Sequence, residues 1–520
     1  MIDPRLVNPT TAVTDGSGID AGRFTAWLSS PALPLAIVGV LAAVGLWWLA
    51  RHVVRYLVTP AVVRPMLRRA WRIKRRWKRT ARRVGLVQVE RGRPGFWSSA
   101  PATTVVEREL IPPVRVQAQD WGVAVDVATL GRTGLAEFQR AAAYLADVWQ
   151  VPQVRVERLR PGWVRLRAIV HDPLTQPLSW AEPVSPSAGR RGSPRRPVTP
   201  GPGPSPDLRR WAAGVDADGQ PVDLRSESVS GIVVAGLAGY GKTSFLNARF
   251  CDLAPSPAVQ FVLIDGKGGP DYDDLFPRAW LSAKDDPSTV RDHLARVRDL
   301  MVARQHAIRT QLGVKNLWRV GPTTAWPLVV VVIDEAHTFL NETKGTDPDS
   351  KKLDALARES ARLVEELVRK GRNVGVQVIL ATQKATGDAI PTKIRDNCQV
   401  AVSFAQRTSE AATAVLGSDI TGFPDEHPRR LQDPAYVGVA SMIADGRPGF
   451  TLVRTRHVSD EVADRIAAST AQLVRDPHQL LIDAARAVEL IEEEDGGPFR
   501  QEPTAALPTS PIHRNGKDLW

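Results

Sequence analysis

The hydrophobic and polar positions divide this chain into segments of very different character. Residues 31–50 form an uncharged apolar run that ends close after Trp47 and Trp48. At about 1.5 Å per residue, a helix over this run would be about 30 Å long, which is the thickness of the hydrocarbon core of a bilayer. The run therefore predicts an N-terminal transmembrane helix. A signal peptide is the alternative, but no basic stretch precedes the run and no small-residue cleavage site follows it.

The charges on either side of this run predict its orientation. Residues 1–30 hold three Asp and two Arg, whereas residues 51–93 hold fifteen Lys or Arg and one acid, Glu90. Cytoplasmic flanks of membrane helices carry an excess of Lys and Arg. We therefore expect residues 1–30 to be an extracytoplasmic tail, residues 31–50 to cross the cell membrane once, and the remainder to be cytoplasmic. The apolar stretch 53–63 either extends the anchor or lies at the interface.

The basic juxtamembrane segment, residues 51–100, has two interpretations. Residues 51–93 carry a net charge of +14 and the whole chain carries +12, so the rest of the protein is close to neutral. One interpretation is a topology signal that also binds anionic lipid. The other is a DNA-contacting neck, because Trp71 and Trp77 are interleaved with arginines. Phosphate groups need only Lys and Arg as partners, so the sequence leaves this choice open.

Residues 101–180 carry the pattern of a small α+β domain. Residues 123–127 alternate valine with small or acidic residues, as a half-buried strand does. Apolar residues then recur at helical spacing over 135–148, and alternating stretches follow at 154–156 and 164–170. The predicted order is strand, helix, strand, strand, with room for one more strand ahead. No catalytic constellation occurs here, which favours an adaptor or scaffold.

Two further segments are unlike folded domains. Residues 181–207 are rich in proline and glycine, and such a sequence behaves as an extended spacer. A Pro-rich ligand for a partner protein is the alternative. Residues 476–520 contain one short helical stretch and are otherwise polar with several prolines, so we expect a mostly disordered C-terminal tail.

Between these segments, residues 208–475 combine continuous apolar runs with amphipathic stretches. Continuous hydrophobicity is typical of parallel strands that are buried on both faces. The amphipathic stretches at 289–312 and 351–372 have apolar residues at helical spacing. The pattern predicts an α/β domain with an open parallel sheet. The apolar runs are 232–235, 259–264, 328–333, 376–381 and 400–404.

The composition agrees with a folded protein of several domains. The chain has 520 residues, of which 43% are apolar and 24% are charged. That length is too great for one ordinary domain, and that apolar fraction excludes a wholly disordered chain. The two cysteines, Cys251 and Cys398, exclude a disulfide scaffold and a four-cysteine zinc site.

The first apolar run of the α/β domain leads into GLAGYGKTS. This sequence fits G-x-x-x-x-G-K-[ST], in which glycines let backbone N–H groups surround phosphates. Lys242 is expected to reach the β and γ oxygens of ATP, and Thr243 to place its hydroxyl on Mg²⁺. Tyr240 is bulky for such a loop and must point outward or cover the nucleotide. The candidate ATP-binding residues are Gly236, Leu237, Ala238, Gly239, Tyr240, Gly241, Lys242, Thr243 and Ser244.

The run at 328–333 ends in an acid pair, Asp334 and Glu335. Ligands of open α/β sheets gather at the carboxyl ends of the strands, so we expect the pair near the phosphate loop. Asp334 would hold Mg²⁺ through water, and Glu335 would orient and polarise the attacking water. A helix cap is the alternative role for an acid pair at a strand end. Gln383, just after the run at 376–381, is placed to sense the γ-phosphate.

Several of these segments together resemble the FtsK/SpoIIIE family of DNA translocases. The resemblance is carried by GLAGYGKTS, by FVLIDGKGG with Asp265 and Lys267, by VVVVIDEAHTFL, and most closely by VEELVRKGRNVGVQVILATQKAT. It covers most of residues 113–465 and includes a stretch similar to the family's adaptor subdomain. The single predicted anchor, with no recognisable winged-helix domain after residue 475, is more similar to smaller actinobacterial-type relatives, including transfer proteins of integrating and conjugative elements.

The resemblance implies a RecA-like motor that assembles as a homo-hexameric ring around double-stranded DNA, with ATP and Mg²⁺ between subunits. An arginine of one subunit would complete the neighbouring site, which can raise the rate by about 10³–10⁵. Arg395 and Arg407, beside the last parallel strand, are the candidates, and surface ion pairs are their alternative role. DNA held through its phosphates would bind with little sequence preference and more weakly at high salt.

Other functions share some of these motifs. A protein-secretion ATPase of the same superfamily would pull polypeptide, although such proteins usually carry tandem motor domains and this chain has one phosphate loop. A nucleotide-dependent membrane scaffold would hydrolyse little ATP, which the intact Lys242 and Glu335 disfavour. A small-molecule kinase is disfavoured because nothing resembles a lid or an acceptor site. The sequence does not separate chromosome segregation from plasmid transfer.

Overall fold

The computed structural model describes residues 32–59, 63–92, 106–180, 206–383 and 389–495. The predicted extracytoplasmic tail, most of the predicted spacer and the end of the predicted C-terminal tail lie outside these residues. The chain divides into two compact units, an N-terminal unit of Met1–His171 and a C-terminal unit of Asp172–Trp520, and each is described by itself.

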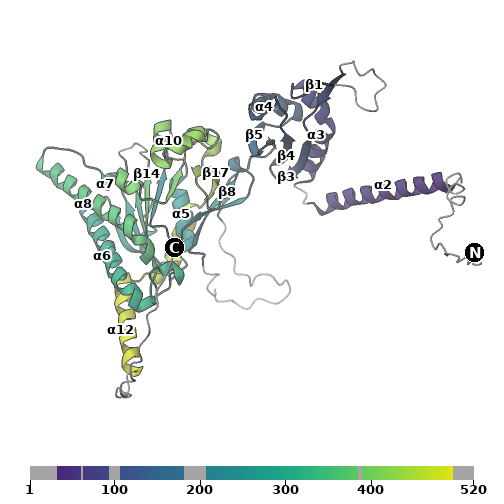
Figure 1. The fold of residues 1–520 in the computed structure, drawn as a ribbon. Coiled ribbons are helices and arrows are strands. Elements are labelled where there is room, and N and C mark those ends of the chain that lie inside the picture. Colours follow the sequence, from purple (N-terminus) through teal and green to yellow (C-terminus); the bar gives the residue numbers. More distant parts are fainter. Residues whose placement is uncertain (1–31, 60–62, 93–105, 181–205, 384–388, 496–520) are drawn as a thin grey trace, which may run out of the picture. The chain divides into compact units, whose positions relative to one another are not determined.

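Helix α2, Ala32–Val58, covers the apolar run and continues into the first basic residues (Figure 1). The stretch that begins at residue 53 therefore continues the same helix as far as Val58. Among the residues that the structure describes, no helix is both long enough and apolar enough to cross a membrane. Among the side chains of α2 that the structure describes, the large exposed apolar ones are Val38, Leu41, Val44, Leu46, Trp47, Val54, Leu57 and Val58.

The N-terminal unit also contains a small α+β domain. Its elements are α3 (Arg64–Arg83), β1 (Gln88–Gly92), β2 (Val106–Leu110), β3 (Val114–Gln119), β4 (Gly122–Ala128), α4 (Leu135–Trp149), β5 (Gln153–Arg160) and β6 (Trp163–Ile169). The main sheet has the order β3-β4-β6-β5 and is antiparallel throughout. Helices α3 and α4 share one hydrophobic core with this sheet. The predicted order of strand, helix, strand and strand is confirmed by β4, α4, β5 and β6, but two strands of the predicted domain, β2 and β3, precede β4 where one was expected.

Helix α3 is part of this domain, although the sequence placed it in a separate basic segment of residues 51–100. Its buried residues include Met66, Ala70, Ile73 and Trp77, which recur at the spacing of one helix face. The indole of Trp77 donates a hydrogen bond of 2.7 Å to a backbone carbonyl just before β3. The small domain therefore begins at α3, and the high charge of the segment concealed its apolar face.

The C-terminal unit is built on one sheet of eleven described strands. They are β7 (Leu178–Ser179), β8 (Arg210–Asp216), β9 (Pro221–Arg225), β10 (Gly231–Ala235), β11 (Val259–Asp265), β12 (Ala279–Lys284), β13 (Leu328–Asp334), β14 (Val376–Thr382), β15 (Val400–Ser403), β16 (Val439–Met442) and β17 (Thr451–His457). The order is β12-β11-β13-β14-β10-β15-β16-β17-β8-β9, with β7 beside β17. The six neighbouring strands β12, β11, β13, β14, β10 and β15 are parallel. The remaining strands of this order, β16, β17, β8 and β9, extend the sheet with antiparallel pairs. The predicted α/β domain with a parallel sheet is confirmed.

Helices cover both faces of this sheet, as its continuous apolar strands require. Helices α5 (Lys242–Leu253) and α11 (Asp460–Thr470) contribute to the core on one face. Helices α6 (Pro287–Leu312), α8 (Pro348–Lys370) and α10 (Ser409–Leu416) contribute to the core on the other, and α6 and α8 run side by side (Figure 1). Neighbouring strand residues such as Val233 and Val234 belong to opposite cores.

Both ends of the C-terminal unit differ from the predicted boundaries. Strand β7 pairs with β17, and the indole of Trp180 donates to Asp252 at 2.8 Å, so residues 172–180 belong to this unit and not to the small domain. A strand of two residues has no periodicity that a sequence can reveal. At the other end, the predicted tail begins with helix α12, Pro477–Asp495, whose buried Leu481 joins the core that includes α6.

Trp77→Ala should destabilise the small domain by about 3–5 kcal/mol, because it removes a large ring from a closed core. Trp71→Ala is the matched control, since Trp71 on the same helix is 57% exposed and Trp77 is 3% exposed. Its effect on the free energy of unfolding should stay within about 0.5 kcal/mol. Amide hydrogen exchange in β4 and β6 of the full chain measures both effects locally. Equal loss of protection in the two variants would contradict the place of α3 in this core.

Candidate nucleotide-binding site

The carboxyl ends of the parallel strands bring the predicted site residues together. Strand β14 lies between β10, which leads into the phosphate loop, and β13, which ends in the acid pair. Ala235 at the end of β10 is level with Thr382 on β14, and Asp265 on β11 is level with Asp334 on β13. Ligands of such sheets bind beyond this edge. The topology therefore unites segments that are far apart in the sequence.

The phosphate loop, residues 236–241, depends on its glycines. Gly239 and Gly241 have φ angles of 77° and 99°, in the left-handed region where a Cβ is strained. At Gly236 an added Cβ would lie 2.5 Å from the Cβ of Phe404. Helix α5 begins directly after the loop, so its first amides have no partner within the helix. Unpartnered amides at a helix N-terminus form a site for an anion.

Lys242 lies inside this loop. Its side chain is 5% exposed, and its ammonium donates hydrogen bonds to the carbonyls of Gly236 and Leu237 at 2.8 and 3.1 Å. Burial lowers the pKa of Lys242, and the charges of Glu335 and Asp334 oppose that shift. The ammonium is therefore within electrostatic reach of both acids, as its predicted role requires.

The acid pair is buried at the end of β13, where Asp334 and Glu335 are each 6% exposed. Glu335 has a φ angle of 48°, a left-handed conformation that costs a non-glycine residue about 1–3 kcal/mol. Two backbone groups fix it, because the Glu335 N–H donates to Oδ1 of Asp334 at 3.0 Å and the Gln383 N–H donates to Oε2 of Glu335 at 3.0 Å. Oε1 of Glu335 is buried and has no hydrogen-bond partner among the described residues. That oxygen is the one available to a water molecule.

The two acids titrate differently although they are adjacent. Burial, and then the charge of Glu335, raise the pKa of Asp334 to about 6. Burial also acts to raise the pKa of Glu335, but hydrogen bonds from His337 and the Gln383 amide, together with the charge of Lys242, outweigh burial and lower that pKa. Glu335 is therefore the stronger acid of the pair and remains ionised at neutral pH, as a group that polarises water must.

Two side chains at this edge were missed by sequence reasoning. Nδ1 of His337, the first residue of α7 (His337–Leu340), lies 3.3 Å from Oε2 of Glu335 and 3.4 Å from the hydroxyl of Thr382. Tyr272 is 2% exposed, and burial with the charge of Asp334 raises the pKa of its hydroxyl. The place of His337 two residues after Glu335 was an available signal, whereas nothing in the sequence marked Tyr272.

Tyr240 points away from the loop, which is one of its two predicted orientations. Its hydroxyl donates to the carbonyl of Gln432 at 2.6 Å, at the end of η7 (Pro428–Gln432), and its carbonyl accepts from the Gly438 N–H at 3.1 Å. Buried Arg454 on β17 fixes the same segment by donating to two of its carbonyls. Tyr240 therefore joins the phosphate loop to segment 428–438.

The other predicted residues lie at two edges of the sheet. Gln383 follows β14 at the site edge and is half-buried, and Arg407 follows β15 at the same edge and is exposed. Arg395 ends the short helix α9 (Thr392–Arg395) ahead of β15, at the opposite edge. Its guanidinium donates to Oδ1 of Asp396 at 3.3 Å and to the carbonyl of Ala414 at 3.0 Å. The fold brings Gln383 and Arg407, but not Arg395, to the edge that carries the phosphate loop.

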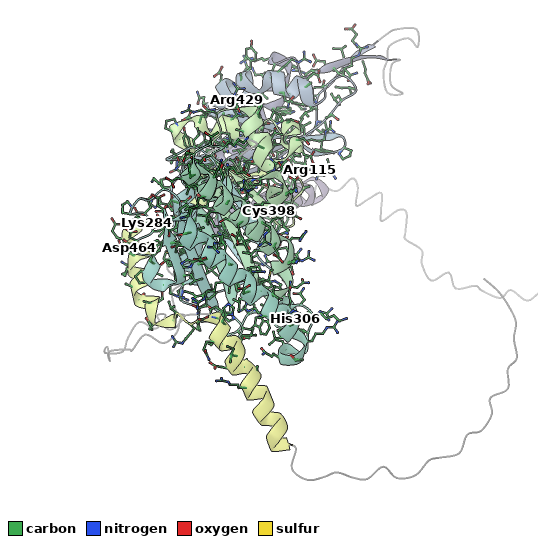
Figure 2. The ribbon with its side chains drawn as sticks, turned by 90° about the vertical axis from the view of Figure 1, so that its left-hand side faces the viewer. Arg115, Lys284, His306, Cys398, Arg429 and Asp464 are labelled. Atoms are coloured by element: carbon green, nitrogen blue, oxygen red, sulfur yellow. The ribbon has the colours of Figure 1, made fainter. Side chains whose placement is uncertain are left out.

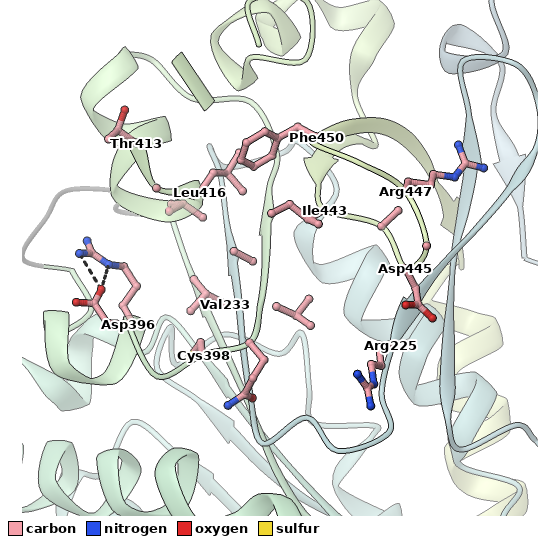
Figure 3. A pocket seen from close by; sticks show the side chains of 18 residues that line it. Arg225, Val233, Asp396, Cys398, Thr413, Leu416, Ile443, Asp445, Arg447 and Phe450 are labelled. Carbon is pink, nitrogen blue, oxygen red and sulfur yellow. Dashed lines mark hydrogen bonds and ion pairs between the residues drawn. The ribbon is translucent and has the colours of Figure 1, made fainter. Parts of the chain in front are cut away.

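Arg395 instead lines a pocket of about 590 Å³ in the C-terminal unit. Figure 3 shows Val233 and Phe450 facing into this pocket and Asp396, the partner of Arg395, at its side. Cys398, which is labelled in Figures 2 and 3, also lines the pocket, and burial raises the pKa of its thiol to about 12. A thiol with that pKa is not a nucleophile at neutral pH. The lining contains neither the phosphate loop nor the acid pair, so the pocket is separate from the site.

The site fits a divalent cation that is shared with phosphate oxygens. Thr243 is half-buried at the second position of α5, and the carboxyl group of Asp334 lies at the same edge of the sheet. Oδ2 of Asp265, level with Asp334, is buried with no hydrogen-bond partner among the described residues. No described group of three His, Cys, Asp or Glu could hold a metal by itself. Mg²⁺ usually takes one or two protein ligands together with phosphates and water, and Thr243 and Asp334 could be those ligands.

Fold and site together define a P-loop nucleoside triphosphatase domain, with a phosphate loop between strand and helix and an acid pair two strands away. The model of the FtsK/SpoIIIE family matches residues 209–346, which contain both the loop and the acid pair. The resemblance read from the sequence is thereby confirmed for this region, and the C-terminal unit contains an ATPase domain that is similar to the FtsK/SpoIIIE family over residues 209–346.

Two curated proteins are similar to part of the chain. The DNA translocase FtsK of Leptospira interrogans serogroup Icterohaemorrhagiae is 28% identical over 212 residues, which are 38% of this chain and 21% of that protein. An uncharacterized FtsK-like protein of Nostoc sp. is 28% identical over 218 residues, which are 40% of this chain and 28% of that protein. The matched region thus spans less than a third of the length of either relative.

Solved structures are similar at a lower level. The pCW3 conjugation coupling protein TcpA, in its monomer form with ATPγS, has a TM-score of 0.47 and 14% identity, over 76% of this chain and 99% of that one. The cytoplasmic domain of the Thermomonospora curvata type VII secretion ATPase EccC has a TM-score of 0.41 and 20% identity, over 60% of this chain and 34% of that one.

Asp334→Asn should stabilise the protein above about pH 6 in the absence of nucleotide and metal. Folding raises the pKa of Asp334 from 3.8 to about 6. Above about pH 6 the carboxyl group is therefore ionised in the folded protein, and its buried charge destabilises the fold. Below about pH 3.8 the group is protonated in both states, so this destabilisation is absent. Asn keeps the oxygen that accepts the Glu335 N–H but carries no charge. The gain in the free energy of unfolding should reach up to about 3 kcal/mol near neutral pH.

Denaturant unfolding at about pH 4 and about pH 7.5 measures this pH dependence. Asp299→Asn is the control, because it removes the same charge from a side chain that is 60% exposed. A gain for Asp334→Asn that is equal at both pH values would contradict the assignment of the raised pKa to Asp334.

Proposed function

We propose that this chain hydrolyses ATP at the edge of its larger sheet and uses the energy to move double-stranded DNA. The observation that carries the proposal is the convergence of Lys242, Asp334 and Glu335 within a domain of FtsK/SpoIIIE type. The names of two relatives, both DNA translocases, support DNA as the substrate. Chromosome segregation during cell division and conjugative plasmid transfer are both consistent with this activity.

The site residues divide the hydrolysis step among them. Amides of the phosphate loop and the ammonium of Lys242 bind the β- and γ-phosphates and offset their charge. Glu335 orients a water molecule through Oε1 and receives its proton as the water attacks the γ-phosphorus, while the bond from that phosphorus to the β–γ bridging oxygen breaks and ADP leaves. Gln383 holds Oε2 of Glu335 with its backbone amide, and its side chain is the sensor of the γ-phosphate. Thr243 and Asp334 would hold Mg²⁺, which neutralises charge on the phosphate oxygens when it is bound.

We further propose that copies of the chain form a homo-hexameric ring, in which one subunit supplies an arginine to the ATP held by the next. Arg407 is the better candidate because it is exposed beside the site edge. Arg395 is held by Asp396 and by a backbone carbonyl, so it would have to break these bonds to reach a neighbour.

Glu335→Gln should retain ATP and lower its hydrolysis by at least about 10²-fold. Gln has nearly the same shape as Glu but cannot receive a proton from the attacking water. Lys242→Ala is the contrasting variant and should lose ATP binding, because it removes the ammonium that the phosphates require. Binding of a fluorescent ATP analogue and release of phosphate in the presence of Mg²⁺ measure the two effects separately. Normal turnover by Glu335→Gln would refute the role of that residue.

The same phosphate-release measurement tests the substrate. Linear duplex DNA should accelerate hydrolysis by the unaltered chain more than single-stranded DNA or unfolded polypeptide does, and displacement of a third strand from a triplex should show movement. Stimulation by polypeptide alone would favour a protein-secretion ATPase. Equal turnover with and without any polymer would instead leave a nucleotide-dependent scaffold.

We propose that residues 31–50 attach the chain to the cell membrane as a single pass, with residues 1–30 outside and the chain after residue 50 in the cytoplasm. The uncharged run and the basic segment after it support this arrangement. The exposed apolar side chains along α2 support it as well, because large exposed apolar surfaces are rare in water.

Alkaline phosphatase fused after residue 30 should be active, and the same enzyme fused after residue 100 should be inactive, because the enzyme works only outside the cytoplasm. Green fluorescent protein fused at the same two positions is the control, since it should give the opposite pattern. Phosphatase activity at residue 100 would reverse the proposed orientation. Recovery of the chain in the soluble fraction would remove the proposed anchor.

A further inference from the structure

Helix α3 has two opposite faces of different character. Met66, Ala70, Ile73 and Trp77 lie in the core of the small domain. On the other side, exposed arginines recur at the same spacings of four and three residues. They are displaced by two positions from the buried residues, which is about 200° around a helix, so they face directly away from the core. This arginine stripe consists of Arg68, Arg72, Arg75, Arg79 and Arg82.

The stripe has little compensation within its own domain. Arg82 pairs with Glu109 at 2.7 Å, and among the residues that the structure describes no other member of the stripe has an ion pair. Helix α3 contains no acidic residue, and Lys74, Lys78 and further arginines on it are exposed as well. Arg75 lies over the ring of Trp71 at 5.1 Å, a contact that holds the guanidinium at the surface. An array of this kind attracts a partner with many negative charges.

An anionic bilayer and a nucleic acid are the two partners with suitable chemistry. A basic amphipathic helix binds a bilayer by inserting its apolar face, and α3 already uses that face inside its own domain. Attraction to headgroups would then act only within a Debye length of about 8 Å. Duplex DNA presents about one phosphate per 1.7 Å of its axis, so a straight stripe about 21 Å long can meet phosphates along its whole length. Arginine also forms paired hydrogen bonds with phosphate, which favours the duplex.

We propose that the arginine stripe of α3 binds the phosphate backbone of double-stranded DNA, as a contact separate from the ATP site. The proposal takes its substrate from the proposed function but does not require ATP hydrolysis. Because the Trp77 hydrogen bond and the core fix the helix, its charges are ordered before DNA arrives. Binding therefore avoids the entropic cost of ordering a disordered basic segment. The contact should be independent of base sequence.

The salt dependence of duplex binding by the full, detergent-solubilised chain without nucleotide tests this proposal, with fluorescence anisotropy as the measurement. Each phosphate contact contributes about 0.9 to the slope of log K against log salt. The stripe variant should lower that slope by about 2–4, and the control variant by less than about 1. The stripe variant carries Arg68→Gln, Arg72→Gln, Arg75→Gln and Arg79→Gln. The control carries Arg132→Gln, Arg140→Gln, Arg158→Gln and Arg160→Gln, which are exposed positions of the same unit and remove the same charge.

Three further measurements make the result unambiguous. Lys at the four stripe positions should restore most of the slope, because the contact depends on charge. Hydrogen exchange in β3 and β4 should match that of the unaltered chain, which shows that α3 stays packed. Binding to vesicles of anionic phospholipid tests the bilayer as the alternative partner. If the stripe variant keeps its DNA slope but loses vesicle binding, the stripe binds the bilayer and the proposal is overturned.

An equal change of slope in the stripe and control variants also overturns the proposal, since the loss then reflects overall charge. Failure of the proposed function leaves this test intact, because no ATP is present. If duplex DNA does not stimulate hydrolysis but the stripe variant loses its slope, the stripe contact stands and the translocase does not. If duplex DNA stimulates hydrolysis and the slopes of the stripe and control variants are equal, the proposed translocase stands and the stripe contact does not.

Discussion

Three charges buried at one edge of a sheet are the constraint on which the C-terminal unit depends. Lys242, Asp334 and Glu335 are each at most 6% exposed, and removing an ion from water costs several kcal/mol unless opposite charges and hydrogen bonds offset that cost. Glu335 is well compensated, which lowers its pKa, whereas burial raises that of Asp334. The charges and hydrogen bonds of the described residues therefore do not fully offset the cost of burying the Asp334 carboxylate. A cation that arrives with the nucleotide would complete it, so the apo site is preorganised for a metal-bound substrate.

The position of the phosphate loop depends on a further buried charge that lies outside the motif. Arg454 on β17 donates to carbonyls of Leu174, Ala435 and Val437, and the segment it fixes meets Tyr240 through Gly438. A Cβ at Gly241 would lie 3.1 Å from the Cα of Gly438, so loop and segment are in close contact. The antiparallel strands are therefore more than an extension of the sheet. They hold the surface on which the phosphate loop rests, and a shift in that segment would reach Lys242 through the loop.

The parallel strands of the sheet could be predicted from the sequence because they are continuous apolar runs that end in polar residues. Every residue of β13 and β14 is buried, so the strand ends are the places where Asp334 and Gln383 can meet a ligand. The contacts of Tyr240 and Arg454 could not be predicted, because a two-residue strand and a run of 3₁₀ turns leave no periodicity. Arg395 is close to β15 in the sequence but is not close to the ATP site. It precedes β15, and in a parallel sheet the start and the end of a strand lie at opposite edges.

Helix α3 shows how a domain can hold an array of like charges in order. Like charges four residues apart, such as Arg68 and Arg72, each cost an isolated helix about 0.2–0.5 kcal/mol, so α3 alone would form poorly in water. Burial of Trp77 and its neighbours supplies the stability that the arginines remove. The buried residues and the exposed arginines of α3 thus recur at the same intervals of four and three residues, on opposite faces of the helix. One stripe fixes the helix on the sheet, and the other keeps its guanidinium groups in a straight line that a flexible basic tail could not maintain.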